Sequence, residues 1–153
     1  MEKIASFTID HLTLLPGLYV SRVDEHDGQV VTTFDMRVTA PNREPALSGA
    51  AMHSFEHLAA TWFRSSEIGD KVVYFGPMGC KTGFYLLLFG RWASEDALPY
   101  VIRCCQFIED FDGEIPGAKP AECGNWSYQD LDGARAIARR YKEALSNNPR
   151  LHY

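Results

Sequence analysis

The sequence has no hydrophobic run long enough to cross a membrane. Its longest strongly apolar stretch, Phe84 to Phe89, falls far short of the roughly 20 residues that a spanning helix needs. The start of the chain, Met1 to Ala5, also lacks the basic and apolar regions of a signal peptide. Internal repeats, low-complexity tracts and long linkers are missing too. We therefore expect a single domain over residues 1–153 that acts in the cytoplasm without a membrane partner.

Positive charge is also scarce. The chain has 15 Lys and Arg against 20 Asp and Glu, which gives a formal net charge of −5. A negative chain is poorly suited to bind nucleic acid or an anionic membrane surface. These features favour a small soluble molecule as the main partner.

Cysteine is limited to four residues, and a reducing cytoplasm would keep them as thiols. Cys104 and Cys105 fall within a helical pattern among apolar neighbours, which predicts core packing. Cys80 and Cys123 instead lie in segments rich in turn residues. Those two thiols are therefore the candidates for chemistry.

Segments rich in β-branched and aromatic residues do not alternate strictly with helical patterns, which favours an α+β fold with a mainly antiparallel sheet covered by helices. Asp27-Gly28 separates two of these segments and predicts a tight antiparallel hairpin. The expected strands span residues 5–9, 18–23, 29–40, 71–75 and 82–89, and the expected helices span 49–64, 94–111 and 127–145.

Three residue signals predict how the helices begin. Ser48 is a suitable N-cap for the first helix, and Ser127 with Asp130 predicts a capping box for the last. Pro99 is expected to be tolerated in the second helix only if it lies within the first turn.

The run His53-Ser54-Phe55-Glu56-His57 places two imidazoles and a carboxylate one helical turn apart in the first expected helix. Residues at i, i+3 and i+4 share a helix face, with Cβ atoms roughly 5–6 Å apart. Two satisfied core histidines are the simpler alternative, but burying these groups together is unfavourable unless hydrogen bonds or a cation compensate. His53 and His57 are therefore predicted metal ligands, with Glu56 beside them.

A third ligand must come from elsewhere in the chain. Cys123, followed by Gly124 in an expected loop, has a soft donor atom and local freedom to reach the ion. A set of two His and one Cys suits Zn(II), Fe(II) or Co(II) and leaves a position open for water or substrate. An ordinary loop thiol is the alternative for Cys123.

Cys80 lies in the Gly-rich turn between two expected strands, where its side chain can be presented rather than packed. A nearby cation would favour its thiolate. With Glu56, it would give two groups able to take and return protons on opposite sides of a carbon skeleton. A half-buried structural cysteine is the alternative.

A second polar set comprises Asp10-His11, Asp35 and Arg37. Arg37 among apolar neighbours could hold a carboxylate or a hydroxyl-rich ligand. Asp35 and Arg37 are two residues apart on a strand and share a face, so they could equally pair with each other.

The order H-x-x-E-H also matches the inverted-zincin metallopeptidases, in which Glu56 would activate a metal-bound water. A small metal-binding structural module with a closed four-ligand site is a further alternative. The peptidase hypothesis assigns no task to Cys80, and the structural module predicts no reactive thiol.

Four separated segments together resemble one family, the S-ribosylhomocysteine lyases, or LuxS autoinducer-2 synthases. The segments are Ser6-Phe7-x-x-Asp10-His11, His53-x-x-Glu56-His57, Pro77-Met78-Gly79-Cys80-x-Thr82-Gly83 and Glu122-Cys123-Gly124-Asn125. Their order, their spacing and the length of the chain agree with that family.

This resemblance implies a four-stranded antiparallel sheet packed against helices, and a homodimer with sites at the subunit interface. It implies one divalent metal per subunit, Fe(II) with Zn(II) or Co(II) as substitutes. The substrate would be S-ribosylhomocysteine, and the products homocysteine and 4,5-dihydroxy-2,3-pentanedione, the autoinducer-2 precursor. By matching positions, the metal ligands would be His53, His57 and Cys123, the acid/base pair Glu56 and Cys80, and the substrate-binding residues Ser6, His11 and Arg37, to which we add Asp35.

One segment departs from many members of the family. Gly76 stands where Ser is common, and Tyr74-Phe75 replaces a more polar pair. Some hydrogen bonds to the substrate are therefore expected to differ.

Overall fold

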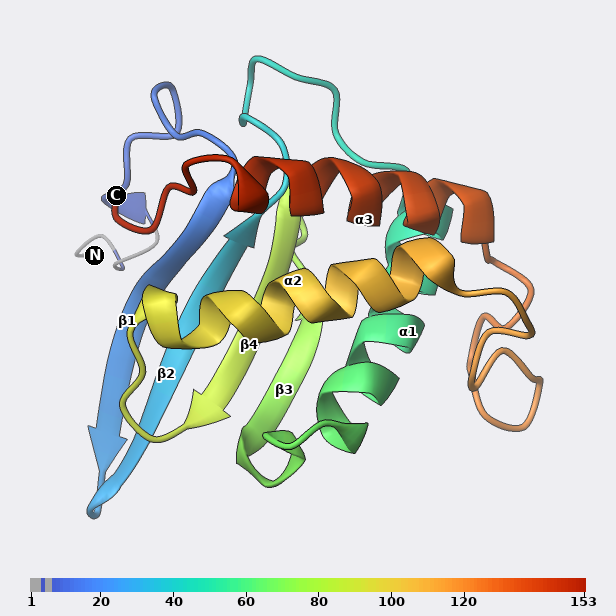
Figure 1. Cartoon of the computed structure of the whole chain (residues 1–153), viewed down its shortest axis with the longest axis horizontal. Coiled ribbons are helices and arrows are strands. Elements are labelled where there is room, and N and C mark those ends of the chain that lie inside the picture. Colours follow the sequence, from blue (N-terminus) through green and yellow to red (C-terminus); the bar gives the residue numbers. More distant parts are fainter. Residues whose placement is uncertain (1–3, 5–6) are drawn as a thin grey trace.

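A four-stranded antiparallel sheet carries three α-helices on one of its faces in the computed structural model, which describes residue 4 and residues 7–153 (Figure 1). The strands lie in the order β1-β2-β4-β3. Their bounds are β1 Gly17–His26, β2 Gln29–Arg37, β3 Val72–Pro77 and β4 Gly83–Phe89. The helices are α1 Gly49–Ser65, α2 Ser94–Asp110 and α3 Leu131–Ser146, and a short 3₁₀ helix, η2 Gly69–Lys71, precedes β3. The predicted α+β class is confirmed.

The hairpin of β1 and β2 turns at Asp27-Gly28, as the sequence predicts. Both residues have positive φ, 48° and 76°, and the flanking His26 and Gln29 pair directly. Such a two-residue turn matches the right-handed twist of the strands it joins. The turn sets the register as far as the pair Arg22 and Thr33, and a shift between Val20 and Arg22 then pairs Tyr19 of β1 with Asp35 of β2.

The two faces of the sheet differ in character because side chains alternate along each strand. Phe34 and Met36 of β2 face the helices and are fully buried. Asp35 and Arg37 of the same strand point to the other face and are also buried. The helix-facing side holds the apolar core, where Phe55 of α1 stacks on Phe84 at a centroid distance of 4.5 Å. Helix α1 is thereby anchored against the sheet beside β3 and β4.

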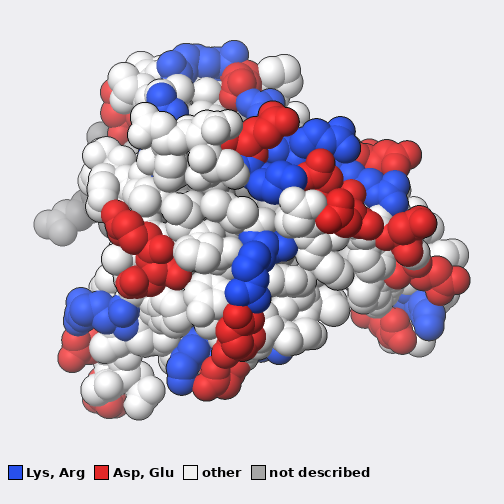
Figure 2. Space-filling view, viewed as in Figure 1, with Lys and Arg blue, Asp and Glu red and all other residues white. Residues whose placement is uncertain are grey.

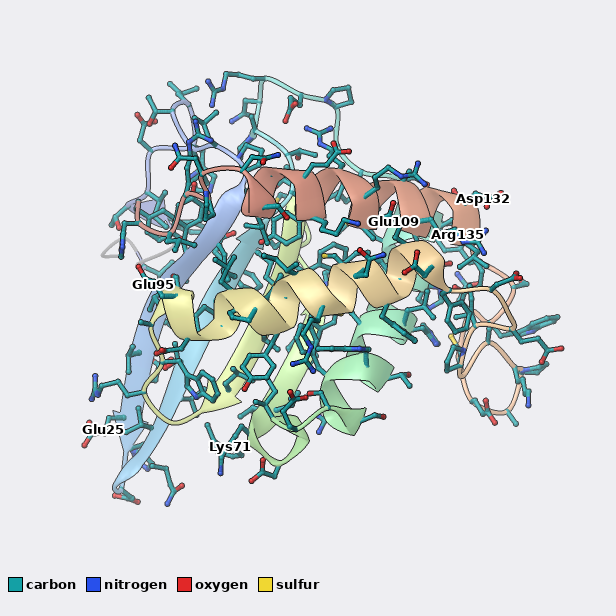
Figure 3. The ribbon with its side chains drawn as sticks, in the orientation of Figure 1. Glu25, Lys71, Glu95, Glu109, Asp132 and Arg135 are labelled. Carbon is teal, nitrogen blue, oxygen red and sulfur yellow. The ribbon has the colours of Figure 1, made fainter. Side chains whose placement is uncertain are left out.

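Helices α2 and α3 lie side by side across the sheet and run in opposite directions (Figure 1). Arg139 and Lys142 of α3 both form ion pairs with Glu109 of α2, which Figure 3 labels. The outer faces of these helices carry acidic and basic side chains intermixed (Figure 2). Among the described residues, no helix combines the length and apolar character needed to cross a membrane.

The prediction of a strand at residues 5–9 is wrong for residues 7–9, which the structure describes. Residues 7–9 form a turn, and Asp10 then accepts hydrogen bonds from the backbone of Leu12 and the hydroxyl of Thr13. The N–H of Phe7 also bonds to the carbonyl of Ile4 at 2.9 Å, so the hydrogen bonds here are local and not made to a neighbouring strand. Residues 5 and 6 lie outside the described part of the chain.

Two expectations about helix ends are also wrong. Asp130, and not Ser127, caps α3, because its carboxylate accepts the N–H of Gly133 at 2.8 Å. Pro99 is the sixth residue of α2 and so lies beyond the first turn. It removes the hydrogen bond to the carbonyl of Glu95, but both residues are exposed at the surface, where that carbonyl can be hydrated. Ser48 does precede α1, although its side chain makes no capping bond.

Cys104 and Cys105 are fully buried in α2, which confirms their predicted core role. Burial raises the pKa of the Cys105 thiol to about 12, so the thiol stays protonated at neutral pH.

Iodoacetamide at pH 8 should modify the exposed Cys80 in the native protein and leave Cys104 and Cys105 unmodified, as mass spectrometry of the peptides would show. All four thiols should react in guanidinium chloride. Rapid native labelling of Cys105 would contradict this packing.

Candidate functional site

His53 and His57 project from the same face of α1, one turn apart. Their Nε2 atoms are 3.0 Å from each other, and the Sγ atom of Cys123 lies 3.4 Å from Nε2 of His53. The three candidate ligand atoms all lie within 4.8 Å of one another, and each residue is partly buried. The structure therefore brings together the three residues predicted as metal ligands, from a helix and a loop 70 positions apart.

Backbone carbonyls fix the orientation of both imidazoles. Nδ1 of His53 lies 2.7 Å from the carbonyl oxygen of Tyr128, and Nδ1 of His57 lies 2.7 Å from that of Pro116. A carbonyl can only accept, so in the neutral imidazole each Nδ1 carries the proton and each Nε2 presents a lone pair. Histidine ligands of metals commonly have this arrangement, with the second ring nitrogen bonded to a carbonyl or a carboxylate.

The two Nε2 lone pairs would repel each other across 3.0 Å if nothing lay between them. A cation shared with the sulfur of Cys123 removes that repulsion, so the donor set fits a metal ion. Two imidazoles and one thiolate suit a borderline divalent ion, and three protein ligands leave a position open. His53, His57 and Cys123 are the residues that would hold it.

The loop of residues 111–130 delivers Cys123 through a turn of its own backbone. The N–H of Cys123 bonds to the carbonyl of Lys119 at 3.0 Å, and the N–H of Asn125 points at the sulfur at 3.5 Å. Gly117 in the same loop has φ +74°, and a Cβ there would lie 3.0 Å from Nδ1 of His57. Only glycine suits that conformation and approach.

Pro116, Gly117 and Tyr128 are functional residues that the sequence analysis missed. Pro116 and Tyr128 act through backbone carbonyls, which no side-chain motif reveals. The dipeptide Pro116-Gly117 was the one available signal, because it marks a tight turn.

Glu56 borders two hollows, and His53 borders both of them as well. One, of about 350 Å³, is bordered by His53, Glu56 and Tyr128 and by residues of the turn between β3 and β4. The other, of about 540 Å³, is bordered by Glu56, His57 and Cys123. The carboxylate therefore adjoins both the ligand cluster and the space beside it.

Cys80 lies in the turn between β3 and β4, and its neighbours Gly79 and Lys81 border the same hollow as Glu56. Lys81 has a positive φ of 58°, and its N–H bonds to the carbonyl of Met78 at 2.9 Å. This tight turn leaves Cys80 exposed, as its predicted role requires. The turn thus borders the hollow next to Glu56, while the sulfur of Cys80 contacts Thr82 at 3.0 Å.

Arg37 approaches Cys80 from β2. Its Nη1 atom lies 3.9 Å from the sulfur of Cys80 and 2.5 Å from the hydroxyl oxygen of Thr82, which itself lies 3.0 Å from that sulfur. Its Nε and Nη2 atoms donate to the two oxygens of Asp35 at 3.0 and 2.5 Å. Burial alone would lower the pKa of Arg37, but the hydrogen bonds and the negative charge of Asp35 outweigh it and leave that pKa raised. A permanent cation therefore lies beside the thiol.

The predicted substrate-binding residues that the structure describes do not form one cluster. Asp35 and Arg37 pair with each other, which was the alternative considered from the sequence. His11 lies in the N-terminal turn, where its Nδ1 is 2.8 Å from the carbonyl oxygen of Ile9, and it borders neither hollow next to Glu56. Ser6 lies outside the described residues. Contact of these four residues with a substrate stays a prediction.

The departure at Gly76 is linked to Tyr74. A Cβ built on Gly76 would lie 1.9 Å from the hydroxyl oxygen of Tyr74, so the tyrosine side chain occupies the space that a side chain at position 76 would need. The two unusual residues therefore accommodate each other on the face of the sheet away from the helices.

The fold and the site together define a small α+β protein with a three-ligand cluster suited to one metal ion. Residues 4–151 match the family model described as S-Ribosylhomocysteinase (LuxS). The chain belongs to the S-ribosylhomocysteinase (LuxS) family.

Curated relatives agree over nearly the whole chain. An S-ribosylhomocysteine lyase of Clostridium acetobutylicum is 49% identical over 156 residues, which cover 100% of this chain and 99% of the relative. Those of Clostridium beijerinckii and Phocaeicola vulgatus are 51% and 53% identical, each over 92% of this chain and 89% and 88% of the relative. The family resemblance seen in the sequence is confirmed, and the inverted-zincin alternative has no support.

Proposed function

We propose that this protein is an S-ribosylhomocysteine lyase, a carbon–sulfur lyase that converts S-ribosylhomocysteine to homocysteine and 4,5-dihydroxy-2,3-pentanedione. The observation that carries the proposal is the cluster of His53, His57 and Cys123 beside Glu56, in a chain whose family model spans residues 4–151. The same protein would serve the methyl cycle and, through the dione, the synthesis of autoinducer-2.

The reaction requires groups that move protons. Shifting the carbonyl of the ribose from C1 to C3 takes two enolisations, each of which removes a proton from carbon and returns one to a neighbouring atom. With the ketone at C3, the proton on C4 becomes acidic, and its removal expels the sulfur from C5 as a thiolate, which then takes up a proton. Substrate and products contain the same atoms, so no oxidant, reductant or organic cofactor is consumed.

Glu56 and Cys80 are the acid/base residues of this proposal. Glu56 projects from α1 into the space beside the ligand cluster, and Cys80 is exposed on the turn that borders the same hollow. Arg37 provides a positive charge 3.9 Å from the Cys80 sulfur. The two residues can thus approach a substrate from different elements of the fold.

A divalent ion held by His53, His57 and Cys123, which we propose is Fe(II) with Zn(II) or Co(II) as substitutes, would supply Lewis-acid stabilisation of the negative charge that builds on the substrate oxygens. The carbonyls of Pro116 and Tyr128 hold the two imidazoles in the tautomer that such an ion needs. Glu56 lies next to these ligands but is left free for proton transfer.

We also propose a homodimer with sites at the subunit interface, acting in the cytoplasm. His11 borders neither hollow next to Glu56 of its own chain, which leaves it available to the site of a second copy. The sheet face opposite α1, α2 and α3 also exposes Tyr74, a large side chain available for contact. A chain that acted alone would leave both features without a role.

The direct test is release of homocysteine. Protein purified without oxygen and loaded with Fe(II) should release one equivalent of thiol for each S-ribosylhomocysteine consumed, measured with a thiol reagent and identified by mass spectrometry. Protein incubated without substrate gives the background from its own cysteines. Folded, metal-loaded protein that releases no homocysteine would exclude the lyase activity.

A further inference from the structure

The hydroxyl of Tyr153 reaches the buried pair formed by Asp35 and Arg37. It donates to an Asp35 carboxylate oxygen at 3.0 Å, and the same oxygen accepts from Nη2 of Arg37 at 2.5 Å. Arg37 continues to Thr82 and to the sulfur of Cys80. A chain of contacts therefore joins residue 153 to the thiol that the proposed reaction uses.

The ion pair in the middle of this chain is almost sealed from solvent. The Arg37 and Asp35 side chains are 3% and 2% exposed. Buried charges are tolerated only when further hydrogen bonds satisfy their remaining donors and acceptors. Arg37 donates hydrogen bonds to Asp35 and Thr82. The hydroxyl of Tyr153, which lies outside the sheet, donates a further hydrogen bond to Asp35. The position of the carboxylate is thus set from two sides.

Tyr153 is itself held in place. Its ring stacks on Tyr19 of β1 at a centroid distance of 4.6 Å and an interplanar angle of 11°. The segment before it is fixed to the same strand by a bond from the N–H of Leu18 to the carbonyl of Arg150 at 2.9 Å. Burial and the negative charge of Asp35 raise the pKa of Tyr153, so the phenol remains a donor at neutral pH.

We propose that Tyr153 is a positioning residue for the reaction: by holding Asp35, it keeps the Arg37 guanidinium directed at Cys80. The inference rests on the proposed function, in which Cys80 transfers protons. If Asp35 were free to shift, Arg37 would follow it, because two of its three nitrogens bond to that carboxylate. The positive charge beside the thiol would then be less well placed.

The test is Tyr153→Phe, which removes the donor but keeps the ring that stacks on Tyr19. We expect kcat for homocysteine release to fall about ten-fold, an order of magnitude less than the roughly 10²-fold effect of a displacement of about 1 Å at a reacting group. KM should stay close to its original value, because the loss affects the transition state. The rate at which iodoacetamide alkylates Cys80 at pH 7 should fall as well, since alkylation requires the thiolate.

His152→Ala is the matched control. His152 precedes Tyr153, is exposed, and pairs with Glu95 at 3.1 Å, away from Asp35. It should leave kcat and the alkylation rate unchanged. Unchanged values of both in Tyr153→Phe would overturn the inference, as would equal losses in the two variants. If the unsubstituted protein releases no homocysteine, the proposed function fails, and the alkylation rates alone still decide whether Tyr153 positions Arg37.

Discussion

Replacing Cys80 with alanine should abolish measurable release of homocysteine while the protein keeps its metal. Cys80 lies outside the ligand cluster, so its removal should not change metal content. General acid/base groups contribute about 10²–10⁴-fold to rate, and Cys80 is proposed to act in more than one proton transfer. The loss should therefore reach the upper part of that range, measured as thiol release with equal amounts of metal-loaded protein.

Cys105→Ala provides a matched control for Cys80→Ala, because it removes a thiol that is buried in α2 away from the site. Its activity per folded, metal-loaded molecule should match that of the unsubstituted protein. Cys80→Ser extends the test, since a hydroxyl has the size of the thiol but ionises far less readily. Full activity in Cys80→Ala would remove this residue from the reaction.

Replacing Cys123 with alanine should instead remove most of the metal at neutral pH. The two imidazoles would remain in place through the carbonyls of Tyr128 and Pro116, but two ligands hold a divalent ion poorly. Changes to residues that only support a ligand reduce metal affinity about 10–100-fold, and loss of the ligand itself should exceed that. Metal analysis after dialysis without oxygen measures the effect.

Cys80→Ala serves as the control for metal content, because it also removes an accessible thiol. It should retain one ion per chain under the conditions that empty Cys123→Ala. Full retention of metal in both variants would mean that Cys123 is not the third ligand. Loss of metal from both would show that Cys80 supports the site as well.

The side chains of the site could be predicted from the sequence because helical spacing alone brings His53, Glu56 and His57 to one face. The hairpin was equally predictable, since Asp27-Gly28 suits the positive φ values of its turn. Cys123 was harder: its softness makes it a suitable ligand, but only the fold shows that the loop reaches α1.

The error at the start of α3 arose because long-range contacts outweigh a local signal. Ser127 and Asp130 match a capping box. However, the carbonyl of Tyr128 hydrogen-bonds to His53, and the hydroxyl of Ser54 accepts the N–H of Asp130 at 2.7 Å. These contacts with α1 delay the start of α3 until Leu131. No pattern within residues 127–130 reveals them, because the partners lie more than 70 positions earlier.

The two carbonyl bonds to the imidazoles also link metal affinity to the order of the loop. Pro116 and Tyr128 stand near its two ends, with Cys123 between them, so the loop of residues 111–130 is held to α1 through all three, and through Ser54 as well. Whatever orders the loop pre-organises the ligand set, and by thermodynamic linkage a bound ion orders the loop in return. Sequence changes in the loop that leave all three ligands intact can therefore tune how tightly this protein holds its metal.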